Sequence, residues 1–197
     1  MLGGAFNPPH VGHLVLAQEA AAALGLDEVL LIPTGEPPHK ALEGDPGAEV
    51  RLEMTERAVL GGGSLRVDPL EVEAAARGEG PSFTYRTVEA LREREPDREI
   101  VLLLGADTAA GLADWRSPER IVATARIGVA SRPGVSGDAV RSALGELGAE
   151  GAERVPMPEV GISSSMIRDR VAGGMPIRYL VPQPVVELIE ERGLYRA

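Results

Sequence analysis

The chain has 197 residues and 44% of them are hydrophobic, which is typical of a globular protein with its own core. Its formal net charge of −10 argues against a surface that grips the phosphates of a nucleic acid. Cysteine is absent, which excludes disulfides and thiolate chemistry, and no apolar run approaches the roughly 20 residues of a membrane-spanning helix. The first residues do not resemble a signal peptide, so we expect a cytoplasmic protein without nucleic-acid or membrane partners.

The hydrophobic pattern predicts short apolar strands that alternate with helices. Strands are expected at 29–32, 65–67, 100–104 and 127–130. Helices are expected at 14–24, 48–60, 85–94, 118–125, 140–147, 166–171 and 185–192. The proline-rich segment 33–46 should be a loop, and the polar segment 71–80 should be irregular. This alternation is typical of an α/β protein with a Rossmann-like, doubly wound parallel sheet. We expect residues 1–197 to form a single domain with a helical C-terminal part from about 160 to 197.

In such sheets, ligands bind at the carboxyl ends of the strands. Three loops follow apolar runs directly: 3–13, 33–40 and 105–107. We therefore expect the functional residues to gather in these loops.

The first of these loops, GGAFNPPHVGH, carries two histidines three positions apart at an expected helix start. Paired glycines allow a ligand to approach the backbone closely, and a helix N-terminus attracts phosphate. His10 and His13 add hydrogen-bond donors for the charge that develops on a phosphoryl group under attack. Metal binding is the alternative, but further ligands are not evident in the sequence.

The only lysine of the chain, Lys40, stands beside His39 and two prolines, while every other cationic side chain is arginine. This isolation favours a functional role for Lys40. The alternative is a chance position on a loop.

A late segment, ISSSMIR, places three serines before a helix and Arg168 one turn inside it. Serine is a good N-cap, so plain capping explains the serines by themselves. With Arg168, the same segment can also bind an anion through hydroxyls, helix N–H groups and a guanidinium fork.

Both motifs resemble those of the nucleotidyltransferase superfamily, whose signatures are His-x-Gly-His after a glycine-rich turn and a late Ser/Thr-rich segment that ends in Arg. Within it, the chain is similar to bacterial nicotinate-nucleotide adenylyltransferases from Gly3 to Tyr195. Further matching segments are PPHK (37–40), PSFTYRT (81–87), LLGAD (103–107), Trp115, SRP (131–133) and the C-terminal YLVPQPVVELIEERGLY. Related enzymes acting on phosphopantetheine or glycerol phosphate share the histidine motif, but they are not expected to share PSFT, GAD and Trp115 in this order. The resemblance implies the nucleotidyltransferase type of the Rossmann-like fold.

The resemblance also implies roles for single residues. The catalytic set would be His10, His13, Lys40 and Arg168. ATP would contact Gly3, Gly4, Ala5, Phe6, His10, His13, Gly105, Asp107, Ile162, Ser163, Ser164 and Arg168. Nicotinate mononucleotide would contact Asn7, His39, Lys40, Thr84, Trp115 and Arg132. Thr84 would receive the nicotinate carboxylate and Trp115 would stack on the pyridine ring, although a core anchor is an equal alternative for the only tryptophan.

The implied reaction is the attack of the mononucleotide phosphate on the α-phosphorus of ATP. The protein has no cysteine, and no serine stands in a nucleophile-elbow motif, so the substrate itself is the expected nucleophile. Mg²⁺ is expected on the substrate phosphates, without a dedicated protein metal site. The amide substrate, dual specificity, or a nucleotide-binding protein without catalysis remain alternatives, and a homo-oligomer is left open.

Several positions depart from the family pattern: Asn7 for a more frequent aspartate, Ala5 for threonine or serine, Phe83 for tyrosine and Ser165 for threonine. Only Met1 and Leu2 precede the glycine pair, where relatives have an apolar strand of several residues. We therefore expect the natural protein to start upstream. The alternative is that another segment fills the place of the strand, or that Met1 to Gly4 forms a short strand by itself.

Overall fold

A computed structural model describes residues 1–38, 42–130, 137–149 and 151–196. The chain divides into two compact units, which are described separately. Unit 1 comprises Met1–Leu2, Leu16–Asp27 and Phe83–Glu159; unit 2 comprises Gly3–Val15, Glu28–Ser82 and Val160–Ala197. A single domain over 1–197 stays a prediction. Within the described ranges, no helix has the length and apolar character needed to cross a bilayer.

Unit 2 is built on a three-stranded sheet in the order β1-β2-β3, with β1 at Leu2–Gly4, β2 at Val29–Pro33 and β3 at Leu65–Val67. Strand β2 pairs with β3 in parallel, and Val29 lies opposite Leu65. Both strands bury apolar side chains because they face the helices α2 (Ala48–Ala58) and α3 (Leu70–Ala76).

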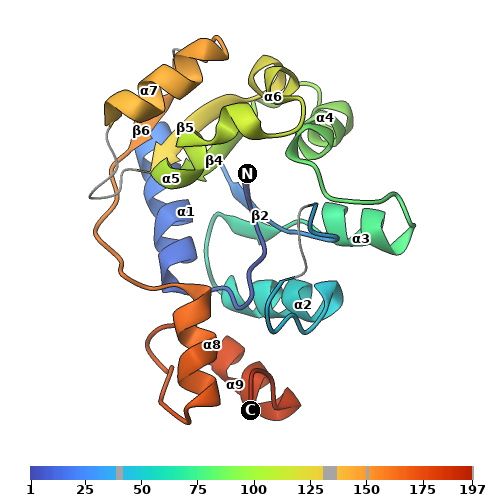
Figure 1. The fold of residues 1–197 in the computed structure, drawn as a ribbon, viewed down its shortest axis with the longest axis vertical. Helices are drawn as coiled ribbons and strands as arrows, with labels where there is room; N and C mark the ends of the chain where they lie inside the picture. Colours follow the sequence, from blue (N-terminus) through green and yellow to red (C-terminus); the bar gives the residue numbers. More distant parts are fainter. Residues whose placement is uncertain (39–41, 131–136, 150, 197) are drawn as a thin grey trace. The chain divides into compact units, whose positions relative to one another are not determined.

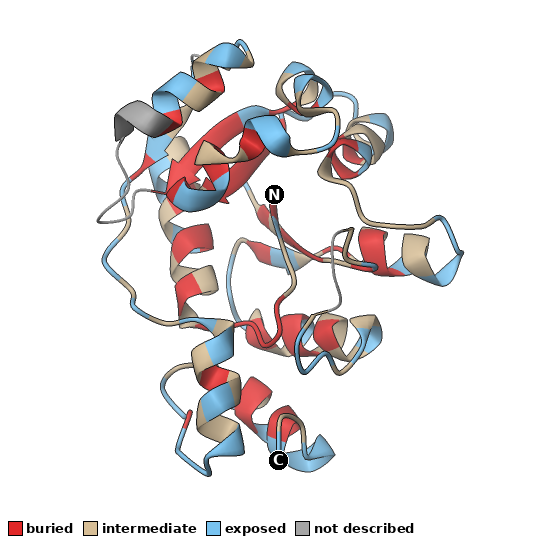
Figure 2. Cartoon of the chain, viewed as in Figure 1, coloured by how far each residue is buried: buried red, intermediate tan, exposed pale blue. Residues whose placement is uncertain are grey.

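The C-terminal helices of unit 2, α8 (Ser164–Ala172) and α9 (Gln183–Arg192), form a second layer with α2. Their apolar faces share one core, which appears in red on α2 and α9 in Figure 2. This core comprises Met54, Ala58, Ile167, Ile177, Val181, Val185, Val186, Leu188 and Ile189. The helix carrying the late serine motif is therefore anchored to the same elements that support the first sheet.

Unit 1 holds the second sheet, in the order β4-β5-β6, with β4 at Val101–Gly105, β5 at Arg126–Ala130 and β6 at Glu153–Val155. Both pairs are parallel. Its helices are α4 (Thr84–Arg94), α5 (Ala106–Ala110), α6 (Pro118–Thr124) and α7 (Gly137–Glu146), with a 3₁₀ turn at Leu112–Asp114 (Figure 1). Helix α1 (Val11–Leu24) begins in unit 2 and contributes its later residues to unit 1.

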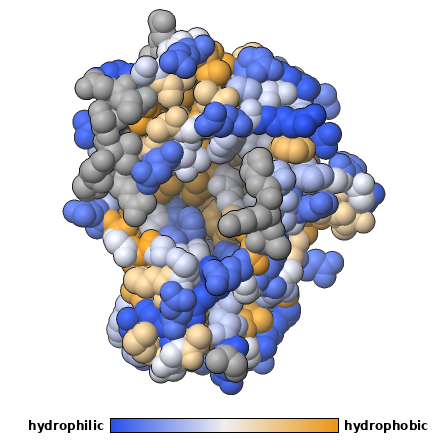
Figure 3. All heavy atoms as spheres, in the orientation of Figure 1, coloured by the Kyte–Doolittle hydropathy of each residue, from blue (hydrophilic) through white to orange (hydrophobic). Residues whose placement is uncertain are grey.

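Close packing in unit 1 depends on Gly128 in β5. A Cβ at this position would lie 2.9 Å from Leu103 Cδ2 and 3.1 Å from Leu24 Cδ1. The outer face of α4 and α6 is mostly hydrophilic in Figure 3, and the carboxylate of Glu89 pairs there with the guanidinium of Arg120 at 2.6 Å. This face is therefore solvated, while the opposite sides of the helices bury apolar residues such as Val88 and Ile121.

The α/β, Rossmann-like class predicted from the sequence is confirmed, with the strands arranged as two three-stranded sheets. The expectation of an irregular segment at 71–80 is wrong, because Leu70–Ala76 is helical. Its run of Glu and Ala residues has high helix propensity, and this outweighs its polar character. Strand β6 and helix α5, of three and five residues, were not predicted, and β1 was expected only as an alternative.

The N-terminal residues form a short strand. In unit 1, the amino group of Met1 donates to Val101 O at 2.5 Å, and Leu103 N donates to Met1 O at 2.9 Å. In unit 2, Thr34 N donates to Gly4 O at 2.9 Å. This agrees with the alternative in which Met1 to Gly4 forms a short strand.

Candidate functional site

The loop after β1 brings two imidazole rings together at the start of α1. The rings of His10 and His13 stack with their centroids 3.8 Å apart. The rings of Phe6 and His13 form a T-shaped contact with their centroids 5.0 Å apart. Phe6 is almost fully buried and takes a left-handed backbone conformation, with φ of 48°. The loop also contains a cis peptide between Asn7 and Pro8. The predicted pairing of the two histidines is thus present as a stacked pair.

Hydrogen bonding fixes the proton on His13. The backbone N–H of His10 donates to His13 Nδ1 at 3.1 Å, so the neutral ring carries its proton on Nε2. Burial, and to a smaller extent the neighbouring His10, lower the pKa of His13 to about 3. Burial also lowers the pKa of His10 to about 4. At neutral pH both rings are therefore uncharged and can donate to an anion, whose arrival would favour the protonated forms.

Two backbone N–H groups at the start of α1 already have hydrogen-bond partners in the protein. Val11 N donates to Leu180 O at 3.0 Å, and His13 N donates to His10 O at 2.9 Å. The sequence predicted free N–H groups at this terminus, but these two already have protein partners. Within the described part of the chain, the one buried side-chain atom without a hydrogen-bond partner is His10 Nδ1. The two imidazoles, and not these two N–H groups, are therefore the groups left to interact with a ligand here.

Gly12 is required by the position of the His10 ring. A Cβ on Gly12 would lie 3.0 Å from His10 Nδ1 and 3.1 Å from His10 Cε1. These distances are shorter than ordinary van der Waals contacts, so the ring would have to move by a few tenths of an ångström. The glycine of the His-x-Gly-His motif thus leaves room for the first histidine.

The late serine motif lies against the histidine loop, although the two are about 160 positions apart. Ser164 Oγ donates to Pro8 O at 2.9 Å, and Arg168 Nη1 donates to Asn7 O at 3.0 Å. Ser163 Oγ accepts from Met166 N at 3.2 Å, so the capping interpretation is confirmed for this serine. The structure brings Ser164 and Arg168 together with the loop, as an anion site built from both motifs requires.

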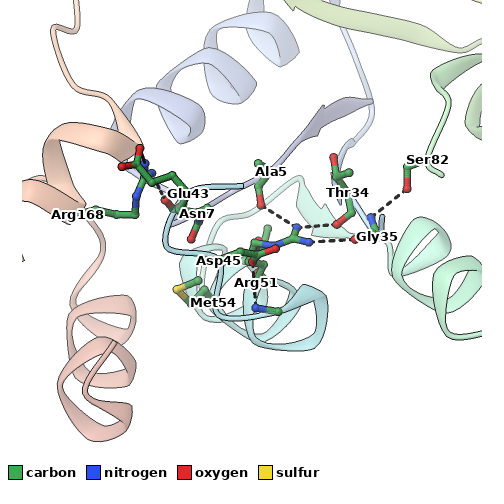
Figure 4. Close-up of polar contacts among 12 residues, drawn as sticks. Ala5, Asn7, Thr34, Gly35, Glu43, Asp45, Arg51, Met54, Ser82 and Arg168 are labelled. Carbon is green, nitrogen blue, oxygen red and sulfur yellow. Dashed lines mark hydrogen bonds and ion pairs between the residues drawn. The ribbon is translucent and has the colours of Figure 1, made fainter. Parts of the chain in front are cut away.

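A third segment completes this cluster, and the sequence did not predict it. The hydroxyl of Tyr195 donates to Asn7 Oδ1 at 2.7 Å, and Asn7 Nδ2 donates to Glu43 O at 3.0 Å. The carboxylate of Glu43 also lies 3.5 Å from Arg168 Nη2. Figure 4 draws these two side chains next to each other, beside Asn7. Burial raises the pKa of Tyr195, so it stays protonated and acts as the donor. In the sequence, Tyr195 was noted only as the last residue of the segment that resembles the family. A single tyrosine after a helix does not indicate which distant residue it will contact.

The remaining predicted residues that the structure describes belong to unit 1. Gly105 ends β4, and a Cβ on it would meet no atom within 4 Å. Asp107 is exposed in the first turn of α5, and Thr84 is the first residue of α4. Trp115 is half-buried and follows the 3₁₀ turn in extended conformation. These residues therefore lie at a strand end, at two helix starts and after a turn, where part of their surface is accessible.

Arginines surround two aromatic rings beside Thr84. The guanidinium carbons of Arg86 and Arg116 lie 5.7 and 5.3 Å from the Phe83 ring centroid. Arg120 lies 4.3 Å from the Tyr85 centroid. A hydrogen bond from Arg86, together with the nearby guanidiniums, lowers the pKa of the Tyr85 hydroxyl. We call this set the arginine–aromatic cluster, and its arginines were not among the predicted site residues.

Three predicted site residues, His39, Lys40 and Arg132, lie outside the described residues. Among the described residues, no group of three or more His, Asp or Glu side chains could hold a metal ion.

Comparison with known proteins adds independent findings. A family model described as cytidylyltransferase-like matches residues 1–170. A Roseiflexus protein named "probable nicotinate-nucleotide adenylyltransferase" is 42% identical over 199 residues, covering 100% of this chain and 96% of its own. A Geobacillus thermodenitrificans protein of the same name is 38% identical, covering 100% and 85%. The Plasmodium falciparum nicotinic acid mononucleotide adenylyltransferase, solved with NaAD, has a similar fold, with a TM-score of 0.79, 17% identity and coverage of 98% and 95%.

Proposed function

Because the chain belongs to the nicotinate-nucleotide adenylyltransferase family, within the cytidylyltransferase-like proteins, we infer that it transfers the adenylyl group of ATP to nicotinate mononucleotide. The products are nicotinate adenine dinucleotide and pyrophosphate, and the reaction is a step in NAD biosynthesis. The observation that carries the proposal is the meeting of His10 and His13 with Ser164 and Arg168 around one loop.

In the proposed reaction, a phosphate oxygen of the mononucleotide attacks the α-phosphorus of ATP, and the bond to the β-phosphate bridging oxygen breaks. Protein nucleophiles take no part, so catalysis consists of positioning two anions and stabilising the charge between them. We assign this stabilisation to His10 and His13, with Ser164 and Arg168 holding the triphosphate. Neutral imidazoles fit this role because they donate hydrogen bonds as charge develops, without first having to lose a bound counterion.

We propose further contacts from the family match. Gly3 to Phe6 and Ile162 to Ser164 would contact ATP in unit 2, while Gly105 and Asp107 of unit 1 would contact the adenosine. Asn7 would contact nicotinate mononucleotide. The same substrate would also contact His39, Lys40 and Arg132.

The nicotinate carboxylate is assigned to Thr84, and the pyridine ring to Trp115. The arginine–aromatic cluster supports the acid over the amide, because its guanidiniums favour a negative group nearby. Thr84 and Trp115 are only partly buried, which leaves part of each side chain open to a ligand contact.

Mg²⁺ is proposed as the metal that accompanies ATP. Since the described residues offer no cluster of ligands, the substrate phosphates would supply most of its oxygen ligands. When bound, the ion would neutralise phosphate charge and favour departure of pyrophosphate. We also propose the cytoplasm as the location, where ATP is abundant.

A pyrophosphate-release assay with ATP and each mononucleotide tests the proposal. We expect turnover with both substrates present, and a catalytic efficiency on the acid at least tenfold above that on the amide, since a site built around polar partners rejects a mismatched analogue strongly. Equal efficiencies would contradict the substrate assignment. Binding of ATP without any release of pyrophosphate would instead support a nucleotide-binding protein without catalysis.

A further inference from the structure

Arg51 is the largest side chain that the structure buries completely, with 0% of its surface exposed. It lies in α2 on the same face as Met54, Thr55 and Ala58, which are also buried. A charged group is costly to bury unless its N–H groups are all well paired. Such a residue is kept where its pairing does something that an apolar side chain cannot do.

The guanidinium of Arg51 bonds to two separate loops. Its Nη1 donates to Ala5 O at 3.0 Å and to Thr34 O at 2.6 Å, and its Nη2 donates to Gly35 O at 3.1 Å. Its Nε donates to the carboxylate of Asp45 at 2.9 Å. Figure 4 shows the guanidinium lying between the carbonyls of the loop after β1 and those of the loop after β2. One rigid, planar fork therefore joins both loops that follow the first two strands.

The bond to Ala5 O acts on a strained position. Ala5 precedes Phe6, whose φ of 48° costs a non-glycine residue free energy and persists only where neighbouring contacts hold it. Arg51 fixes the peptide plane between Ala5 and Phe6, and this plane sets the direction in which the Phe6 ring leaves the backbone. The centroid of that ring lies 5.0 Å from the centroid of the His13 imidazole, and the two ring planes are inclined by 70°. A continuous line of contacts thus runs from Arg51 through Phe6 to His13.

The second loop is equally constrained. A Cβ on Gly35 would lie 2.0 Å from Glu71 O, so the backbone of this residue is packed directly against α3. Gly35 N donates to Ser82 Oγ at 3.1 Å, and Thr34 N donates to Gly4 O at 2.9 Å. With its position fixed in this way, the second loop provides a firm support against which Arg51 holds Ala5.

We propose that Arg51 is a positioning residue for the adenylyl-transfer reaction: it holds the Ala5–Phe6 peptide so that the Phe6 ring keeps the His13 ring in the orientation in which Nδ1 accepts from His10 N, the bond that fixes the Nε2–H tautomer. This inference rests on the proposed function for its kinetic part. Arg51 itself touches no substrate; it acts through the backbone and one aromatic ring.

The test compares Arg51→Lys and Arg51→Met with two controls in the full-length protein. Arg57→Met removes another arginine of helix α2. The ion-pair partners of Arg57 are two surface glutamates, Glu53 and Glu191. Val186→Ala opens a cavity in the core shared by α2 and α9, and so lowers stability without touching either loop. Turnover and KM for both substrates are measured by pyrophosphate release, and the His13 ring nitrogens are observed by ¹⁵N NMR.

We expect Arg51→Lys to lower kcat about tenfold to a hundredfold, with KM values changed less than threefold, because an ammonium cannot reach four acceptors on two loops. In both Arg51 variants, the ¹⁵N shifts of His13 should move away from the pure Nε2–H tautomer. Both controls should keep the wild-type kcat and the wild-type His13 shifts.

Wild-type kcat and His13 shifts in Arg51→Lys would overturn the proposal. An equal loss of kcat in Val186→Ala would also overturn it, since the effect would then follow stability alone. If Arg51→Met does not fold, Arg51→Lys decides by itself. A wild-type protein without adenylyltransferase activity would refute the proposed function, whereas the His13 shifts would still decide whether Arg51 positions that ring.

Discussion

The histidine loop of unit 2 and the substrate-assigned residues of unit 1 differ in how much protein surrounds them. His10 and Asn7 are buried, and the loop receives bonds from Ser164, Arg168 and Tyr195. In unit 1, Asp107 is exposed, and Thr84 and Trp115 are only partly covered.

The difference suggests a division of labour. Groups that stabilise developing charge must be held in a fixed geometry, because small displacements cost much of their effect. Groups that select a base or a ring need an accessible surface and a suitable local charge. Changes in the loop should therefore alter turnover, and changes in unit 1 should alter substrate preference.

The largest effect is expected from His13→Ala. Loss of one preorganised donor should lower kcat by about 10²–10³, while the denaturation midpoint should change little. Gln18→Ala, on the exposed side of the same helix, should keep wild-type turnover. If the kcat of His13→Ala equals that of the wild type, His13 takes no part in the reaction.

Acid should destabilise the protein through the same two histidines. Their folded pKa values of about 4 and about 3 lie below the ordinary 6.5, so the unfolded chain binds more protons as the pH falls below about 6.5. Stability should be flat with respect to these groups above this pH. Between pH 7.5 and pH 5 it should fall by up to about 2 kcal/mol for each histidine.

Urea unfolding at pH 7.5 and pH 5 measures this loss. A variant carrying both His10→Gln and His13→Gln is the comparison, because carboxylates contribute equally in both proteins. The variant should lose less stability on acidification; an equal loss would show that the histidines are not held neutral by burial.

Gly12→Ala should have a smaller effect. The new Cβ displaces the His10 ring by a few tenths of an ångström, which should lower kcat about threefold to tenfold. Gly145→Ala in α7 is the matched control, since its Cβ meets nothing within 4 Å and should raise helix stability by about 0.5–1 kcal/mol. Unchanged turnover in Gly12→Ala would show that the reaction tolerates movement of His10.

The smallest effect is expected in unit 1. Arg116→Met removes one guanidinium near Phe83 and should lower the acid-to-amide ratio of kcat/KM about threefold to fivefold, which is the scale of one near-surface charge. Arg126→Met removes an equal charge from β5, where Glu99 and Glu153 already pair with it. If both variants shift the ratio equally, overall charge and not the arginine–aromatic cluster sets the preference.

The sequence predicted those elements that carry a strong periodic or apolar signal. Strand β4 and helices α4 and α9 agree with the expected ranges to within a few residues, because long apolar runs and amphipathic repeats are local properties. The helix at Leu70–Ala76 was missed because its polar residues masked its helix propensity. Strand β6 was missed because its three residues, ERV, form no apolar run, whereas the equally short β3 was predicted from its apolar residues.

For the site, the sequence supplied the two motifs but not the contacts that hold them. Arg51 lies on the face of α2 that also carries Met54 and Ala58. This position on an apolar face was the one feature of the sequence that indicated a buried charge. Its partners are backbone carbonyls, which no residue type reveals. Likewise, the contact of Tyr195 with Asn7 depends on how α9 packs, and packing is a property of the whole fold.

The contact between Tyr195 and Asn7 spans 188 positions, which matters during synthesis of the protein. At about 5–20 residues per second, the ribosome needs about 10–40 s to add the segment that completes the loop. The residues of the histidine loop are thus synthesised long before the partners that hold them. Until those residues are made, the nascent histidine loop lacks the hydroxyl, serine and arginine that hold it, so its geometry can form only after Tyr195 has been added.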